Sequence, residues 1–136
     1  MNRLPSALAP LLRTLNPQRQ PGVYAFASAA ESADLVALRP LATFRESEGL
    51  TLILEEARAL AAGLPVHLRA AWLTLTVPSG LYDVGLTAAV AGALADAGIA
   101  CNAVAAVHHD HLFVPVEQAD AALAALDALQ RAASGT

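Results

Sequence analysis

The chain has 136 residues, of which 56% are hydrophobic and only 15% are charged. This composition excludes an intrinsically disordered chain. The longest uncharged apolar runs, residues 84–95 and 97–107, are shorter than the roughly 20 residues that a membrane-spanning helix needs. We therefore expect a single soluble chain of one large or two small domains, with no membrane partner.

Charge and cysteine content narrow the class of protein further. Eight arginines and no lysine stand against twelve acidic residues, and the arginines are scattered along the chain. Without a basic stripe, nucleic acid is not an expected partner. Cys101 is the only cysteine, and the N-terminal residues lack the pattern of a secretory signal. The sequence therefore predicts a cytoplasmic protein with no disulfide.

The first half of the chain predicts a mixture of helices and strands. Leucines at helical spacing predict a helix over 4–15, and the aromatic run 23–27 predicts a strand followed by a surface loop at 31–34. Residues 41–45 and 50–54 flank a turn and predict a β-hairpin. A helix is expected over 55–62, ended by Gly63 and Pro65.

The second half predicts strand, helix, strand, strand, helix. Residues 72–77 alternate strictly between apolar and polar, and Asp83 is placed to cap a helix that runs to about Ala97. Strands at 99–107 and 111–116 then enclose a turn at 108–110, and a helix is expected over 117–130. This order is a ferredoxin-like unit that lacks only its last strand.

The two halves share their hairpin-to-helix order at an offset of 62 residues. We therefore predict an α+β fold of two ferredoxin-like βαββα modules in tandem, with an antiparallel sheet and its helices on one face. The expected boundaries are residues 1–68 for an N-terminal, degenerate module and 69–136 for a C-terminal module.

Several segments resemble the ACT domain family. The loop and helix of residues 81–97, followed by Ala97-Gly98-Ile99 and then Asn102, are similar to the glycine-containing loop, small-residue helix and exit of an ACT domain. Residues 40–52 and 109–115 resemble small bacterial tandem-ACT proteins, which are similar in architecture to arginine-sensing ACT proteins. The resemblance implies a non-catalytic regulatory protein that binds an amino acid or a similar small effector at a module or subunit interface, without a cofactor.

The chemistry of an effector site can be placed on this loop. A helix N-terminus favours a carboxylate, glycines allow close approach to the backbone, and Asp83 and Asn102 offer polar atoms to an ammonium or carboxylate group. Tyr82 stands where many ACT domains have aspartate, so for Asp83 the role of helix cap is favoured over a role in ligand binding. The candidate effector-binding residues are Ser79, Gly80, Tyr82, Asp83, Val84, Gly85, Leu86 and Asn102.

Two other classes of function remain open. The sequence His108-His109-Asp110-His111 puts His109 and His111 on one face of a strand, so a metal site or an enzymatic site is an alternative. The other alternative is a purely structural dimerisation module, because edge strands of an ACT-like sheet need covering. A homodimer is expected in either the regulatory or the structural case. No catalytic residue is assigned, because no nucleophile or phosphate-binding motif occurs.

Overall fold

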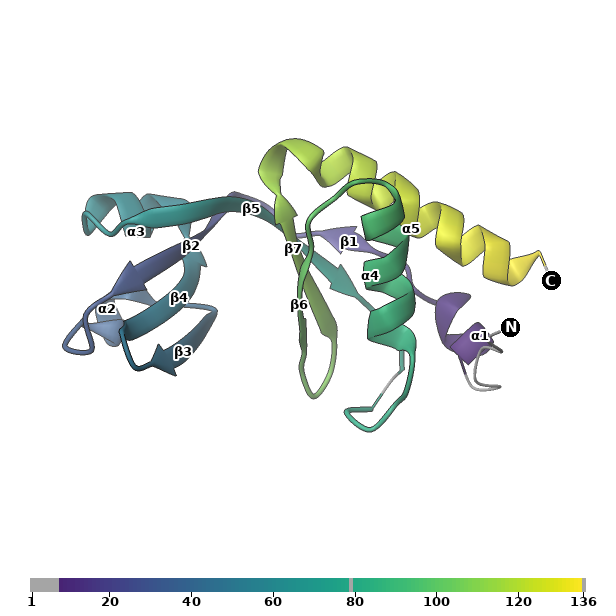
Figure 1. The fold of residues 1–136 in the computed structure, drawn as a ribbon, viewed down its shortest axis with the longest axis horizontal. Helices are drawn as coiled ribbons and strands as arrows, with labels where there is room; N and C mark the ends of the chain where they lie inside the picture. The colour runs from purple at the N-terminus through teal and green to yellow at the C-terminus, as the bar shows by residue number, and fades with distance from the viewer. Residues whose placement is uncertain (1–7, 79, 136) are drawn as a thin grey trace. The chain divides into compact units, whose positions relative to one another are not determined.

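The computed structural model describes residues 8–78 and 80–135, which form two compact units (Figure 1). Residues 21–71 form one unit, called here the N-terminal module. Residues 8–20 and 72–135 form the other, called the C-terminal module. Among the described residues, no helix combines the length and the apolar character that crossing a membrane requires.

The N-terminal module has the complete strand and helix order of a ferredoxin-like fold. Its strands lie in the order β3-β4-β2-β5, and the neighbours are antiparallel. The fourth strand is the first part of β5, which has a bulge opposite Phe26 and Ala27. The elements are β2 (Tyr24–Ala29), α2 (Leu35–Leu38), β3 (Ala42–Glu46), β4 (Gly49–Glu55), α3 (Glu56–Ala61) and β5 (Val66–Leu75).

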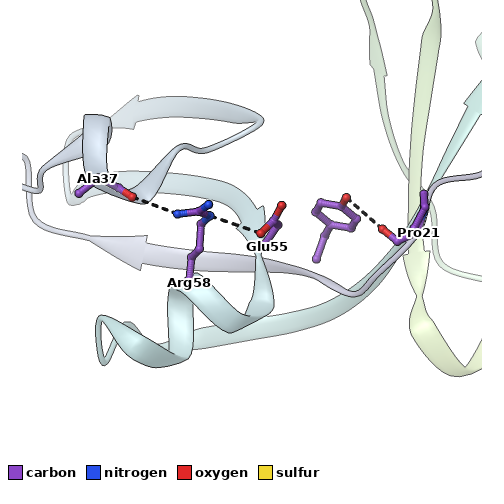
Figure 2. Close-up of polar contacts among 5 residues, drawn as sticks. Pro21, Ala37, Glu55 and Arg58 are labelled. Atoms are coloured by element: carbon purple, nitrogen blue, oxygen red, sulfur yellow. Dashed lines mark hydrogen bonds and ion pairs between the residues drawn. The ribbon is translucent and has the colours of Figure 1, made fainter.

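The core of the N-terminal module lies between one face of the sheet and its two helices. Alternate residues of β2 and β4 point to this face, where Leu38 of α2 and Ala59 of α3 join them. Both helices therefore cover the same face. Arg58 donates to the carbonyl oxygen of Ala37 and pairs with Glu55, which links α3 to the end of α2 (Figure 2). The residues buried in this core are Ala25, Ala27, Leu38, Leu50, Leu52, Leu54 and Ala59.

The C-terminal module is also ferredoxin-like, but its fourth strand comes from the start of the chain. The strand order in this module is β1-β5-β7-β6. Residues of α4 and α5 pack against the inward face of β5 and β7 through Leu73, Leu75, Leu112 and Val114. The further elements are α1 (Leu8–Leu12), β1 (Gln18–Arg19), α4 (Leu86–Asp96), β6 (Asn102–Ala105), β7 (Asp110–Pro115), the 3-10 helix η1 (Val116–Gln118) and α5 (Ala119–Ser134).

The segment from α1 to β1 packs against α5 and forms hydrogen bonds with it. Leu8, Leu12 and Leu15 are almost fully buried. The Gln130 side-chain amide donates to the Arg13 carbonyl oxygen at 2.8 Å, and its oxygen accepts from the Asn16 backbone amide at 3.0 Å. The structural division therefore differs from the expected boundaries 1–68 and 69–136, because residues 8–20 lie with the C-terminal module.

Most predicted elements are present, with altered ends. The hairpin of β3 and β4 and the helices α3, α4 and α5 lie where the sequence predicts them. The predicted helix 4–15 is described only from residue 8, and it ends at Leu12. Strand β5 begins at Val66 rather than Trp72, and β6 is shorter than the predicted 99–107. Helix α2 was not predicted; it follows the expected loop 31–34 and is capped by the Asp34 carboxylate.

The docking of residues 8–20 can be tested with two leucine-to-alanine variants. Leu15→Ala removes a side chain with no exposed surface, so we expect the free energy of unfolding to fall by about 2–5 kcal/mol. Leu81→Ala, in the same module but on an exposed loop, should change it by no more than about 0.5 kcal/mol. Urea unfolding followed by circular dichroism measures both. Equal stability of the two variants would contradict the docking of this segment.

Candidate functional site

The loop before α4 is closed by Asp83, which does not cap the helix. The Asp83 carboxylate accepts a hydrogen bond from the Gly80 backbone amide at 2.5 Å, and the Asp83 amide donates to the Gly80 carbonyl oxygen at 3.1 Å. The N-cap residue of α4 is Gly85, with φ of 99°, and it has no side chain with which to cap the helix. The predicted capping role of Asp83 is therefore wrong, because a left-handed glycine starts the helix two residues later.

The candidate effector residues fall into an exposed group and a buried one. Tyr82 is fully exposed and Val84 is 74% exposed, whereas Leu86 is 5% exposed and belongs to the core. Leu81 beside them is 64% exposed. Ser79 lies outside the described residues. The loop thus presents apolar side chains to solvent next to the uncapped first turn of α4, whose backbone amides lack intrahelical partners.

The space between α4 and the hairpin of β6 and β7 is almost filled. A crevice of about 10 Å³ separates Leu86, Thr87 and Val90 from residues 103–105, Asp110 and Leu112. This volume is at the lower limit for a single water molecule. Asn102 is exposed on β6, opposite Phe113, and does not line the crevice. This crevice is therefore too small to hold an amino acid.

In the histidine-rich turn of residues 108–111, a hydrogen bond from Trp72 fixes which nitrogen of His111 carries the proton. The indole Nε1 of Trp72 donates to Nδ1 of His111 at 3.0 Å. An indole nitrogen is a donor only, so neutral His111 carries its proton on Nε2, the other nitrogen that could bind a metal. Among the residues that the structure describes, no three His, Cys, Asp or Glu side chains are grouped to hold a metal ion. These observations count against the metal alternative.

Two titratable groups near β6 and β7 are shifted by burial. Partial burial, with His109 nearby, holds the pKa of His111 below its usual range, while Asp110 acts in the opposite direction. Burial raises the pKa of the Cys101 thiol, which disfavours the nucleophilic thiolate. Cys101 is therefore poorly suited to catalysis at neutral pH.

The N-terminal module has two open hollows that the sequence did not indicate. One, of about 340 Å³, is lined by residues 21–24 and 55–57. Its acids, Glu55 and Glu56, are paired with Arg58 and Arg69, which neutralises their charge within the module. The Tyr24 hydroxyl at this hollow donates to the Pro21 carbonyl oxygen, and burial together with Glu55 raises the pKa of this tyrosine.

The second hollow, of about 640 Å³, lies at the turn between β3 and β4 and is lined by residues 30–31 and 45–49. Glu46 accepts from the Thr51 hydroxyl, and the Glu48 carboxylate accepts from the Ser47 hydroxyl. Both hollows depend on strands that meet only after folding, so spacing along the chain gives no sign of either one.

Comparison with protein families identifies the class of these modules. A model of the ACT domain matches residues 6–71, and a second ACT domain model matches residues 68–128. The chain belongs to the ACT domain family, with two ACT domains in tandem. No match is found among curated proteins.

Solved structures of other proteins are similar to this chain. The Vibrio cholerae protein VC0802, of unknown function and described as a possible transport protein, is 44% identical over 91% of this chain and 96% of that one, with a TM-score of 0.83. Atu0741 from Agrobacterium tumefaciens is 18% identical over 84% and 87%, with a TM-score of 0.71. The regulatory subunit of aspartate kinase from Thermus flavus is 11% identical over 85% and 98%, with a TM-score of 0.57, and shares the fold.

The left-handed start of α4 can be tested with two glycine-to-alanine variants. At Gly85 the positive φ strains any L side chain, so we expect Gly85→Ala to destabilise the protein by about 1–2 kcal/mol. Gly92 lies inside the same helix, and the position that an added Cβ would take is open, so Gly92→Ala should stabilise the protein by about 0.5–1 kcal/mol. Thermal unfolding measures both signs. Stabilisation by both substitutions would contradict a strained glycine at the helix start.

Proposed function

We propose that this chain is a non-catalytic ACT-type regulatory protein that binds an amino acid or a similar small effector at the loop of residues 79–86. The observation that carries the proposal is the uncapped start of α4 beside the exposed side chains of Leu81, Tyr82 and Val84. The tandem ACT domains support it, as does the fold shared with regulatory subunits of aspartate kinase.

The groups at this loop match the groups of a free amino acid. The first-turn amides of α4 and the helix dipole favour the α-carboxylate. Asp83 uses Oδ2 to close the loop, and among the described residues none hydrogen-bonds to Oδ1, to which we assign the α-ammonium group. Asn102 can donate to or accept from either group through its exposed amide. The effector's side chain would then contact the apolar residues of the loop.

The effector site is proposed to be completed by a second copy of the chain. Leu81, Tyr82 and Val84 are too exposed to enclose a ligand within one chain. Strand β6 is last in its sheet order, and all four of its residues are exposed, so its outer edge is open to pairing. A symmetric homodimer would cover both the edge and the loop.

Binding can be tested with a thermal-shift screen against the common amino acids. A ligand that binds only the folded chain raises its unfolding midpoint. Val84→Asp places a carboxylate beside the proposed carboxylate site at an exposed position, so we expect affinity for the active ligand to fall about tenfold or more. Val36→Asp, in the N-terminal module and 88% exposed, is the matched charge control and should leave binding unchanged.

The outcomes separate the three classes of function. A midpoint shift that Val84→Asp weakens and Val36→Asp does not would support the regulatory role. A persistent dimer that no amino acid stabilises would favour the structural dimerisation module. Bound metal in the untagged protein, lost in His109→Ala and His111→Ala, would favour the metal or enzymatic alternative instead.

A further inference from the structure

The indole ring of Trp72 joins β5 to two positions of β7. Besides its hydrogen bond to His111, with ring centroids 5.7 Å apart, it stacks on Phe113 at 6.3 Å and an interplanar angle of 15°. His111 and Phe113 are two residues apart on β7, so they share one face of the strand. This face is opposite to the one where Leu112 and Val114 meet the helices.

The hydrogen bond between Trp72 and His111 exists only while the imidazole is neutral. Protonation puts a hydrogen on Nδ1, and two donors then face each other. We propose that the Trp72–His111 pair is a pH-sensitive contact, in which protonation of His111 releases the indole N–H and loosens the hairpin of β6 and β7 from β5. The released imidazolium can turn toward Asp110 or over the indole face, where a cation is attracted by the ring.

Two titratable residues act on the charge state of His111. His109, whose ring lies edge-on at 6.4 Å, and Asp110 are its neighbours on the hairpin. Residues 72–75 of β5 and 102–105 of β6 contain no titratable side chain. Partial burial and His109 lower the pKa of His111, and Asp110 offsets part of this effect. The neutral state is therefore favoured by the fold.

The sign of the pH dependence follows from this shift. Because the folded state holds the pKa of His111 below its value in the unfolded chain, the unfolded chain binds a proton first as the pH falls. The contribution of the contact is complete above about pH 6.5 and is lost as the pH falls from there through the folded pKa. Loosening should therefore begin in mildly acidic solution.

The test uses the indole N–H resonance of the full chain, because Trp72 is the only tryptophan. In a pH titration followed by NMR, we expect this resonance to shift with one midpoint below about 6.5, together with the His111 ring protons. Amide hydrogen exchange in β7 should become faster over the same range. His111→Asn keeps an oxygen acceptor near the Nδ1 position but cannot titrate, so its indole resonance should stay constant.

His109→Gln is the matched variant at the neighbouring histidine. Removing His109 removes a charge that opposes protonation of His111, so the midpoint should rise while the transition persists. The proposal is overturned if the indole resonance of the wild-type protein does not follow the titration of His111. This measurement does not depend on any variant. It is also overturned if the transition survives unchanged in His111→Asn or disappears in His109→Gln.

Discussion

The C-terminal module depends on the antiparallel pairing of β1 with β5. Without Gln18 and Arg19 opposite Thr74 and Leu73, its sheet would have three strands, and this stretch of β5 would lose its partner. The pairing is backed by a second contact at a much larger sequence separation, where Gln130 binds the backbone of Arg13 and Asn16. Closing a loop of more than a hundred residues costs entropy that these contacts and the burial of three leucines must offset.

Local patterns in the sequence predict the elements that carry their own signal. The hairpin of β3 and β4 has two strand-like runs on either side of a polar turn, and α5 repeats alanine and leucine at helical spacing, so both are confirmed. Strand β1 has two residues, both polar and exposed, and therefore no apolar pattern to recognise. The first part of β5 follows Gly63 and Pro65, which end the preceding helix. It also has the polar, exposed residues His67 and Arg69, so the sequence does not show that the strand begins at Val66.

In the candidate site, too, features set by neighbouring residues could be predicted, whereas contacts between distant residues could not. Sequence placed the loop and the start of α4 within a few residues, because glycine and aspartate cluster there. It could not distinguish Asp83 from Gly85 as the N-cap residue of the helix, since both residue types are suited to that position. The Trp72–His111 contact joins residues 39 apart, and only the neighbouring positions of β5 and β7 bring them together. Spacing along the chain gives no sign of such a pair.

The origin of β1 also changes how the tandem should be described. Residues 21–71 lie between the strand that completes the C-terminal module and the strand that opens its βαββα order. In topological terms, residues 8–20 and 72–135 form a circularly permuted ferredoxin-like unit, and residues 21–71 are inserted into it. A single cut in the chain therefore cannot yield two intact halves, and a gene fragment that encodes the second family match alone omits one of its strands. Any engineered fusion or exchange of these units has to keep residues 8–20 and 72–135 together.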